Sequence, residues 1–399
     1  MKITTINLCP ALFAATFLTC CTPADAPLSN EYLVAVNETV DFVADDVFNA
    51  FGANEYPEIA DLAARALRAK AYRAALVTYN TVDPWGNPVI ADATFYYPTD
   101  VKIKGVIEMS GIAHMHKTGG STESVPVMEC LPIMTGYAVI LPDMIGYGKY
   151  GNTKEMIHPY GMSENLGRTA YDCRRAAMEY FAGIGYCVPK NTLIAGYSYG
   201  GGVGMAVAKY YQTYYADEIH IERLVLGGGA YDLNAACRGY VAQPICTYPL
   251  LPGMLMALDY YNHLNLDFSR IFTGPLADHY AQWYDRTTSA SGILHLVGDD
   301  MRAYMHPDFY KPREEQNSEF QKLYPILTAN SAVEGWVPKM PIYLYHAEDD
   351  LYVPIACAQY ATERFKSQGV YVHYVHGPGS HADWGVRTFV DLCLYLLIR

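Results

Sequence analysis

Short apolar runs alternate with segments of helical periodicity through most of this sequence. Six apolar runs of β-type residues predict strands at 105–109, 137–141, 192–195, 223–226, 342–345 and 370–375. Helical patterns cover residues 164–181, 200–211, 355–366 and 384–397. Near-continuous apolar strands that alternate with helices are typical of a parallel sheet covered on both faces. The pattern therefore predicts an α/β fold.

Two further elements precede these runs. A helical pattern covers residues 58–71, and a hairpin follows it. In the hairpin, AALVTYNT (74–81) and VIADATFYYP (89–98) flank VDPWGNP, whose proline, glycine, asparagine and aspartate favour a turn. With the two hairpin strands, the predicted sheet has eight strands.

The alternation stops between residues 232 and 337. So long a stretch is uncommon as a loop in a compact domain, and we expect a mainly helical cap or lid over one end of the sheet. The expected core is then 27–231 together with 338–399. Within the cap, YPLLPGMLMALDYY is apolar and either lines an acyl pocket or forms the cap's own core. Leu255 and Tyr260 are its candidate pocket residues.

One serine has the setting of a nucleophile. The stretch LIAGYSYGGG (193–202) contains Gly-x-Ser-x-Gly, between a predicted strand and a predicted helix. In this strand–turn–helix setting the motif predicts a sharp, strained turn that exposes Ser198. Gly196 and Gly200 would let neighbouring backbone approach that turn, because they carry no side chain. Ser198 is the candidate nucleophile.

A serine hydroxyl needs a base, and the base needs an acid that orients it. IYLYHAEDDLYVP (342–354) is a strand followed by an acidic loop, and YVHYVHGPGSHADWG is a strand followed by a glycine-rich loop. We assign Asp350 as the acid, with Glu348 and Asp349 as rivals, and His381 as the base. All three roles thus follow late strands in the order serine, acid, histidine.

These motifs resemble the α/β-hydrolase superfamily over residues 73–399. ILPDMIGYG (140–148) and HPYGMSENLGRTAYDCRRAA (158–177) resemble its secretory-lipase and serine-esterase branch. The resemblance implies an eight-stranded, mostly parallel sheet whose second strand is antiparallel, and an oxyanion hole of two backbone N–H groups. One would belong to Tyr199. The other would come from SGIAHMH (110–116), with Ile112 preferred and Ala113 second.

The family's His-Gly-Gly-Gly type of loop is absent here, and Ser110-Gly111 stands in its place. Gly111 and Tyr197 adjoin the expected donors and the serine, so they are further candidates for substrate contact. His114 and His116 stand two residues apart, but without a third ligand at a suitable spacing they are better explained as loop histidines. We expect neither a metal nor another cofactor.

The N-terminal segment resembles a bacterial lipoprotein signal. Lys2 precedes an apolar stretch, 8–18, which is too short to span a bilayer, and Cys20 and Cys21 follow it. Either cysteine could be lipidated, or the chain could be secreted after cleavage behind Ala26. Residues 1–26 are thus expected to hold the signal peptide and the start of a linker, and both alternatives predict export, with a lipid anchor as the only membrane attachment.

The charge and cysteine content narrow the choice of partners. A formal charge of −13 disfavours binding to nucleic acid and to anionic membrane surfaces.

Seven cysteines lie beyond the signal segment, and their spacings match no zinc site. Either Cys237 and Cys246 form a disulfide, or the cysteines are small buried apolar residues. Nothing in the sequence indicates an oligomeric state.

The expected function is carboxylic ester hydrolysis of a small-molecule acyl ester through an acyl-enzyme. A serine peptidase of the dipeptidyl or prolyl type, or an acyltransferase, would use the same three residues. A peptidase that trims N-terminal dipeptides would need acidic cap residues for the substrate amine, and Glu314 and Glu315 are the candidates. A lipid- or glycan-binding lipoprotein with a relic site is the non-enzymatic alternative.

Overall fold

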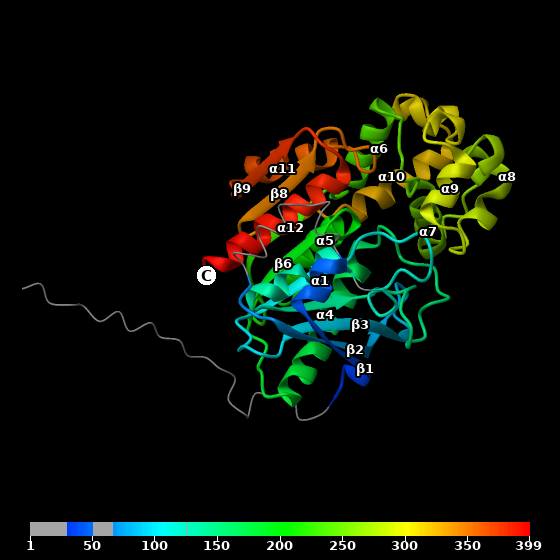
Figure 1. The fold of residues 1–399 in the computed structure, drawn as a ribbon. Coiled ribbons are helices and arrows are strands. Elements are labelled where there is room, and N and C mark those ends of the chain that lie inside the picture. Colours follow the sequence, from blue (N-terminus) through cyan, green and yellow to red (C-terminus); the bar gives the residue numbers. More distant parts are fainter. Residues whose placement is uncertain (1–29, 51–66, 125) are drawn as a thin grey trace, which may run out of the picture.

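A computed structural model describes residues 30–50, 67–124 and 126–399 (Figure 1). One sheet runs through them in the order β1-β2-β3-β5-β4-β6-β7-β8-β9. Its strands are β1 (Leu33–Val43), β2 (Ala71–Val82), β3 (Pro88–Pro98), β4 (Val106–Ser110), β5 (Ala138–Pro142), β6 (Asn191–Tyr197), β7 (His220–Gly227), β8 (Ile342–Ala347) and β9 (Val372–Gly377). All eight strands predicted from the sequence are present.

The sheet is parallel from β5 to β9, where β5, β4, β6, β7, β8 and β9 pair in the same direction. The hairpin strand β3 runs antiparallel to both β2 and β5, as the resemblance implied for the second strand. The carboxyl ends of β4, β6, β7 and β8 therefore meet at one edge of the sheet. Ser110, Gly196 and Gly227 lie at that edge in neighbouring strands.

The expectation of eight strands omitted β1, which adds a ninth strand antiparallel to β2. Only Leu33 is buried among the residues of β1, while Val34, Val36 and Val40 are more than two-fifths exposed. Its apolar run ends at Val36, and polar residues interrupt the remainder of this solvated edge strand. Its β-branched residues were the available signal.

Helices cover both faces of the sheet. On one face lie α4 (Ser163–Gly183), α5 (Tyr199–Tyr214) and α11 (Ala356–Ser367), whose apolar residues pack in two core clusters with the strands. On the other face lie α1 (Ala44–Ala50), α3 (Val127–Cys130) and α12 (His381–Leu397). The helix predicted at 58–71 falls mainly outside the described residues. Its last residue, Ala71, begins β2 instead.

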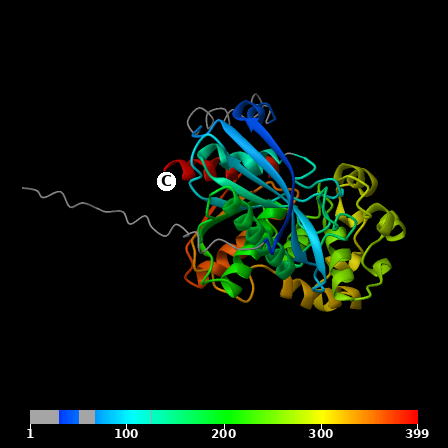
Figure 2. The ribbon, with the colours of Figure 1, turned by 90° about the horizontal axis from the view of Figure 1, so that it is seen from below.

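Between β7 and β8 the chain forms a series of helices. They are α6 (Leu233–Ala242), α7 (Leu251–Asn262), α8 (Gly274–Trp283), α9 (Ala290–Val297) and α10 (Ser318–Asn330), with short 3₁₀ helices among them. Figures 1 and 2 both show this segment, coloured green to orange, as a block beside one end of the sheet. Its two ends meet where the Ala332 N–H donates to the carbonyl of Tyr231 over 3.0 Å.

A second contact joins the segment to the β2–β3 turn. The Trp85 indole N–H donates to the Tyr261 carbonyl over 3.1 Å, and its ring stacks on His263.

In the part of the chain that the structure covers, no helix is both long and apolar enough to cross a bilayer.

The proposed disulfide between Cys237 and Cys246 is absent, and both thiols are reduced and buried. Cys246 instead donates from Sγ to the Tyr248 carbonyl over 3.2 Å. These two cysteines therefore behave as small apolar residues, which was the alternative interpretation of the sequence.

Candidate active site

Ser198 occupies the turn between β6 and α5, with φ 58° and ψ −128°. A positive φ is rare for a residue with a side chain, and it persists only where the surroundings enforce it. Two hydrogen bonds do so here: the Ser198 N–H donates to the Gly227 carbonyl over 2.9 Å, and the Gly201 N–H donates to the Ser198 carbonyl over 2.9 Å. The turn has the strained geometry predicted from the motif.

The glycines beside Ser198 are required by close backbone approach. A Cβ atom on Gly196 would overlap the carbonyl group of Gly200. A Cβ atom on Gly200 would overlap the carbonyl oxygen of Ser110 at the end of β4. Glycine at these two positions therefore brings the start of α5 against the loop that follows β4.

Asp350 and His381 are paired. The His381 Nδ1 lies 2.6 Å from Asp350 Oδ2, and both residues are buried. The other carboxylate oxygen accepts the N–H groups of Tyr352 over 2.8 Å and Val353 over 2.9 Å. His346 Nε2 lies 3.3 Å from Asp350 Oδ2. An ionised carboxylate at this position holds the proton of His381 on Nδ1.

Two opposing effects set the charge of Asp350. Burial raises the pKa of its carboxyl, but the hydrogen bond and charge of His381, with a further contribution from His346, outweigh burial and hold the pKa below its ordinary value. The carboxylate is therefore ionised at neutral pH. The His381 Nε2 is buried and has no hydrogen-bond partner among the described residues, so its lone pair can accept a proton.

The two rival carboxylates lie elsewhere. Glu348 pairs with His376, with 2.7 Å between Oε1 and Nδ1, and that pair is exposed. Asp349 accepts the Gly379 N–H over 3.1 Å. Of the three acids that the sequence offered, Asp350 is the one bonded to His381.

His381 lies close to the Ser198 turn. The Ser198 N–H is bonded to Gly227, and a Cβ atom on the next residue, Gly228, would lie only 3.0 Å from His381 Cε1. Tyr197, the residue before Ser198, donates from its hydroxyl to the His381 carbonyl over 2.6 Å. Tyr197 is 2% exposed, and its side chain contacts the His381 backbone and not the cleft, so the expectation that it contacts substrate was wrong.

Ser198 opens into a cleft of about 850 Å³. Its walls are largely apolar, and several come from the segment between β7 and β8: Leu233, Ala236, Leu250, Leu251 and Met254. Five tyrosines also line the cleft: Tyr160, Tyr199, Tyr240, Tyr248 and Tyr352. Among the residues that the structure describes, no aspartate or glutamate lines this cleft.

The two candidate pocket residues of the segment do not line the cleft. Leu255 is 2% exposed within the apolar core. Tyr260 is 44% exposed and packs its ring against Trp85, with 5.1 Å between the ring centroids. Leu251 and Met254, which lie three residues apart on one face of the same helix, line the cleft instead. Sequence alone did not determine the rotation of α7.

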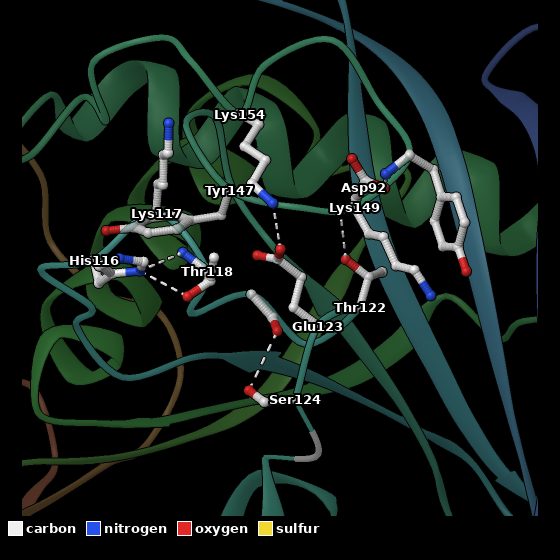
Figure 3. A network of polar contacts seen from close by, with 12 residues as sticks. Asp92, His116, Lys117, Thr118, Thr122, Glu123, Ser124, Tyr147, Lys149 and Lys154 are labelled. Atoms are coloured by element: carbon white, nitrogen blue, oxygen red, sulfur yellow. Dashed lines mark hydrogen bonds and ion pairs between the residues drawn. The ribbon is translucent and has the colours of Figure 1, made fainter. Parts of the chain in front are cut away.

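The loop after β4, residues 111–126, is held by polar contacts on its outer side (Figure 3). The buried Asp143 carboxylate accepts the N–H groups of Ser121 and Thr122. Figure 3 also shows the ion pair of Lys154 with Glu123 and the bond of the Lys149 N–H to the Thr122 hydroxyl, 3.2 Å long. These contacts fix the loop to residues 143–154.

The start of this loop places the two candidate oxyanion donors, the N–H groups of Ile112 and Ala113, in different surroundings. The Ile112 N–H donates to Glu129 Oε1 over 3.2 Å, and Gly111 and Ile112 line a neighbouring hollow of about 880 Å³. Burial raises the pKa of the Glu129 carboxyl. Ala113 alone of these three residues lines the Ser198 cleft. In this structure Ala113 is therefore better placed than Ile112 to face the cleft, and Gly111 faces the neighbouring hollow.

Tyr199 stands in the first turn of α5, where backbone N–H groups have no partner within the helix. Its hydroxyl lies 2.6 Å from His158 Nε2, and His158 Nδ1 lies 2.7 Å from the Ile145 carbonyl. Because a carbonyl only accepts, Nδ1 carries the proton and Nε2 accepts from Tyr199. Burial lowers the pKa of His158 to about 3, so this neutral form persists.

Sequence reasoning missed His158 and the tyrosines around it. The hydroxyls of Tyr147 and Tyr160 both donate to the His114 carbonyl in the loop after β4. The signal for this arrangement was the excess of 36 tyrosines over 13 phenylalanines. Tyrosine supplies apolar area together with a hydroxyl that can anchor a backbone carbonyl.

The loop histidines are not part of a metal cluster. His116 Nδ1 lies 2.6 Å from the Thr118 hydroxyl (Figure 3), and burial lowers the pKa of His114 to about 4. Across residues 30–50, 67–124 and 126–399, no group of three histidine, cysteine or acidic side chains is arranged to hold a metal ion.

Comparisons with known proteins agree with this architecture. A model of the secretory lipase family matches residues 120–381. Over 257 residues the chain is 24% identical to a secreted triacylglycerol lipase of Malassezia furfur. That alignment covers 61% of this chain but 43% of the relative, so the chain spans less than half of the relative's length.

Solved structures extend the likeness over nearly the whole chain. A Legionella pneumophila protein superposes with a TM-score of 0.78 at 20% identity, covering 92% of this chain and 98% of its own. The rice cell wall degrading esterase LipA of Xanthomonas oryzae gives 0.73 at 19% identity, with 93% and 97% covered. Candida antarctica lipase A gives 0.55 at 14%, with 93% and 87% covered. The fold is that of the α/β hydrolases.

Proposed function

The chain belongs to the secretory lipase family, and on that premise we propose that it hydrolyses carboxylic esters through an acyl-enzyme formed on Ser198. The observation that carries this proposal is the buried Asp350–His381 pair beside the strained Ser198 turn. A base oriented by an ionised acid is what a serine hydroxyl needs to attack a carbonyl carbon.

In the proposed reaction, Ser198 Oγ attacks the ester carbonyl while His381 Nε2 takes the hydroxyl proton. Asp350 keeps the other ring proton on Nδ1 and stabilises the imidazolium that forms. The tetrahedral intermediate expels the alcohol, which receives its proton from His381. Water, activated by the same nitrogen, then releases the acid and restores Ser198.

The oxyanion would be bound by the N–H groups of Tyr199 and Ala113. The first turn of α5 supports Tyr199 as a donor, and the position of Ala113 in the cleft wall supports it over Ile112, whose N–H is bound to Glu129. Such donors act in the transition state, and the loss of one typically lowers kcat by about 10²–10³.

Residues 232–337 would act as a cap that selects the acyl group. The contribution of Leu251 and Met254 to the cleft supports this proposal, and so do its apolar walls. Largely apolar walls suit an apolar acyl group or an aromatic acid. Substrate preference would therefore lie mainly in this segment.

The same cleft argues against a peptidase that binds a free substrate amine. An ammonium group in an apolar cleft needs a carboxylate partner, and the described part of the chain places no acidic residue in the wall. Glu314 and Glu315 are exposed in a short 3₁₀ helix and are not among the lining residues. Ester hydrolysis is therefore the better supported use of the three residues.

A substrate panel tests the proposal. The purified protein should hydrolyse p-nitrophenyl acyl esters and leave dipeptidyl p-nitroanilides intact. Cleavage of the anilides at a comparable kcat/KM would favour a peptidase, and acyl transfer to an added alcohol in preference to water would favour an acyltransferase. Turnover of none of these substrates, without labelling by a fluorophosphonate, would leave the binding-protein alternative.

Export is a further proposal. The apolar stretch before Cys20 and Cys21 supports it, and the aligned relative is described as secreted. Mass spectrometry of the mature N-terminus from the native host would distinguish a diacylglyceryl cysteine at Cys20 or Cys21 from cleavage after Ala26. An intact Met1 would contradict export.

A further inference from the structure

Tyr248 lies between α6 and α7, in the segment that would select substrate, yet its contacts reach the catalytic parts of the core. Its hydroxyl donates to the Ala113 carbonyl over 2.8 Å. Its ring stacks on Tyr352, with centroids 5.3 Å apart and planes 27° apart. Tyr352 stacks in turn on His381, at 4.7 Å and 26°. One side chain thus touches the oxyanion loop and, through one ring, the catalytic imidazole.

The backbone around Tyr248 is itself anchored to the loop that carries Asp350. The Thr247 N–H donates to the Leu351 carbonyl over 2.9 Å. The Tyr240 hydroxyl, from α6, donates to the Tyr352 carbonyl over 2.7 Å. Because the acid loop, Tyr248 and Tyr352 are connected in this way, a shift of one would displace the others.

The contact at Ala113 helps to fix the direction in which the Ala113 N–H points. On one side of the Ala113 N–H, the Ile112 N–H is bound to Glu129. On the other side, the Ala113 carbonyl is bound to Tyr248, and the next carbonyl, of His114, is bound to Tyr147 and Tyr160. The peptide groups that flank the Ala113 N–H are therefore fixed, and Tyr248 provides the contact on its C-terminal side.

We propose that Tyr248 is a positioning residue that sets the placement of the Ala113 N–H relative to His381 in the ester hydrolysis proposed above. The inference rests on that function and deepens it, since it assigns to the substrate-selecting segment a part in the chemical step. Oxyanion donors must lie within a few tenths of an ångström of their place, and an error of about 1 Å can lower a rate by about 10².

The first test is Tyr248→Phe, which removes the hydroxyl and keeps the stacked ring. The expected result is a fall in kcat of about 10-fold with little change in KM. The fall should be equal for short-chain and long-chain p-nitrophenyl esters, because the lost contact is to the loop and not to the acyl group. Affinity for a trifluoromethyl ketone, which mimics the tetrahedral intermediate, should fall by the same factor.

The matched control is Tyr360→Phe. Tyr360, in α11, donates its hydroxyl to Glu334 Oε1 over 2.9 Å and is not among the residues that line the Ser198 cleft. This variant loses an equivalent hydrogen bond and should keep the wild-type kcat. Thermal unfolding of both variants would show that each is folded at the assay temperature.

A double-mutant cycle with Tyr352→Leu tests the connection to His381. If the two tyrosines act through one contact, the double variant should be no slower than the slower single variant. Effects that multiply would contradict the connection. An unchanged kcat in Tyr248→Phe, or an altered ranking of ester chain lengths, would overturn the proposal and leave Tyr248 as a wall residue.

The wild-type protein separates this inference from the proposed function. Ester turnover by the wild type, with fluorophosphonate labelling of Ser198, would establish the function whatever Tyr248 does. If the wild type turns over esters and Tyr248→Phe does so equally well, only the role of Tyr248 fails. If the wild type fails to turn over esters, the proposed function itself fails.

Discussion

The Ser198 cleft has two sides that are built differently. On the sheet side, Ser198, Asp350 and His381 each follow the end of a strand, and local turns with N–H groups two or three residues away help to hold Ser198 and Asp350. On the opposite side, the loop after β4 and the segment 232–337 meet through side chains from distant parts of the chain, such as Tyr248 on Ala113. The chemistry is encoded locally, and the cleft wall is encoded by tertiary packing.

This difference explains which side could be predicted from the sequence. A strand, a turn and a helix around Gly-x-Ser-x-Gly leave one conformation for Ser198, and the acid and base follow neighbouring parallel strands. The parallel core required only the alternation of apolar runs and helices. Asp350 was preferred over its two neighbours by the Val353-Pro354 that follows, and it is the acid bonded to His381.

The other side depends on quantities that one sequence does not contain. The rotation of α7 decides whether Met254 or Leu255 faces the cleft, and that rotation is set by packing. The orientation of the Ile112 N–H depends on Glu129, which is 17 residues away. The ninth strand was missed because its apolar run ends at Val36 and polar residues interrupt the remainder of the strand. Cys237 and Cys246 could equally have been bonded or buried.

The largest expected effect is that of Ser198→Ala, on the sheet side. Without the hydroxyl no acyl-enzyme can form, and kcat should fall by about 10⁴-fold or more while the protein stays folded. Steady-state hydrolysis of p-nitrophenyl esters and circular dichroism check the two parts. Activity near the wild-type level in a pure sample would show that the nucleophile lies elsewhere.

Asp350→Asn should have the next largest effect. An amide cannot stabilise the imidazolium of His381 and favours the wrong ring tautomer, so kcat should fall by about 10³–10⁴. The matched controls are Glu348→Gln and Asp349→Asn, which remove neighbouring charges that do not touch His381 and should keep kcat within about threefold of wild type. Equal rates for the three variants would mean that Asp350 is not the acid that orients His381.

The lowered pKa of His114, in the loop after β4, predicts that stability depends on pH. Burial lowers the pKa of His114 to about 4, so the folded protein binds its proton less readily than the unfolded chain. The unfolding free energy that comes from keeping His114 neutral is fully present above the ordinary histidine pKa. It is lost as the pH falls toward 4. His114→Gln should therefore be less acid-sensitive, by about 3 kcal/mol in unfolding free energy between pH 7 and pH 4.

Denaturant unfolding of the two proteins at both pH values measures this difference. The Asp92 carboxyl, whose pKa burial raises to about 6, changes stability in the opposite sense, but it is common to both proteins and cancels. A comparison at pH 8 gives the packing cost of the substitution alone. Parallel pH profiles would show that His114 is not held neutral by the loop.

The smallest expected effect is on specificity. Met254→Ala should enlarge the cleft and shift the preferred acyl chain toward greater length, changing the ratio of kcat/KM values by about 10-fold. The control is Leu255→Ala on the same helix, which should lower stability by about 2–5 kcal/mol and leave the chain-length ranking unchanged. If Leu255→Ala alters the ranking and Met254→Ala does not, the assignment of the wall is wrong.

The central claim is that Ser198 is a nucleophile activated by His381. The most direct measurement is peptide mapping by mass spectrometry after exposure to a fluorophosphonate, for the wild type and for His381→Ala. The account predicts one adduct per chain on the peptide that contains Ser198, formed far more slowly in the variant. An adduct on another residue, or none in a protein that hydrolyses esters, would contradict it.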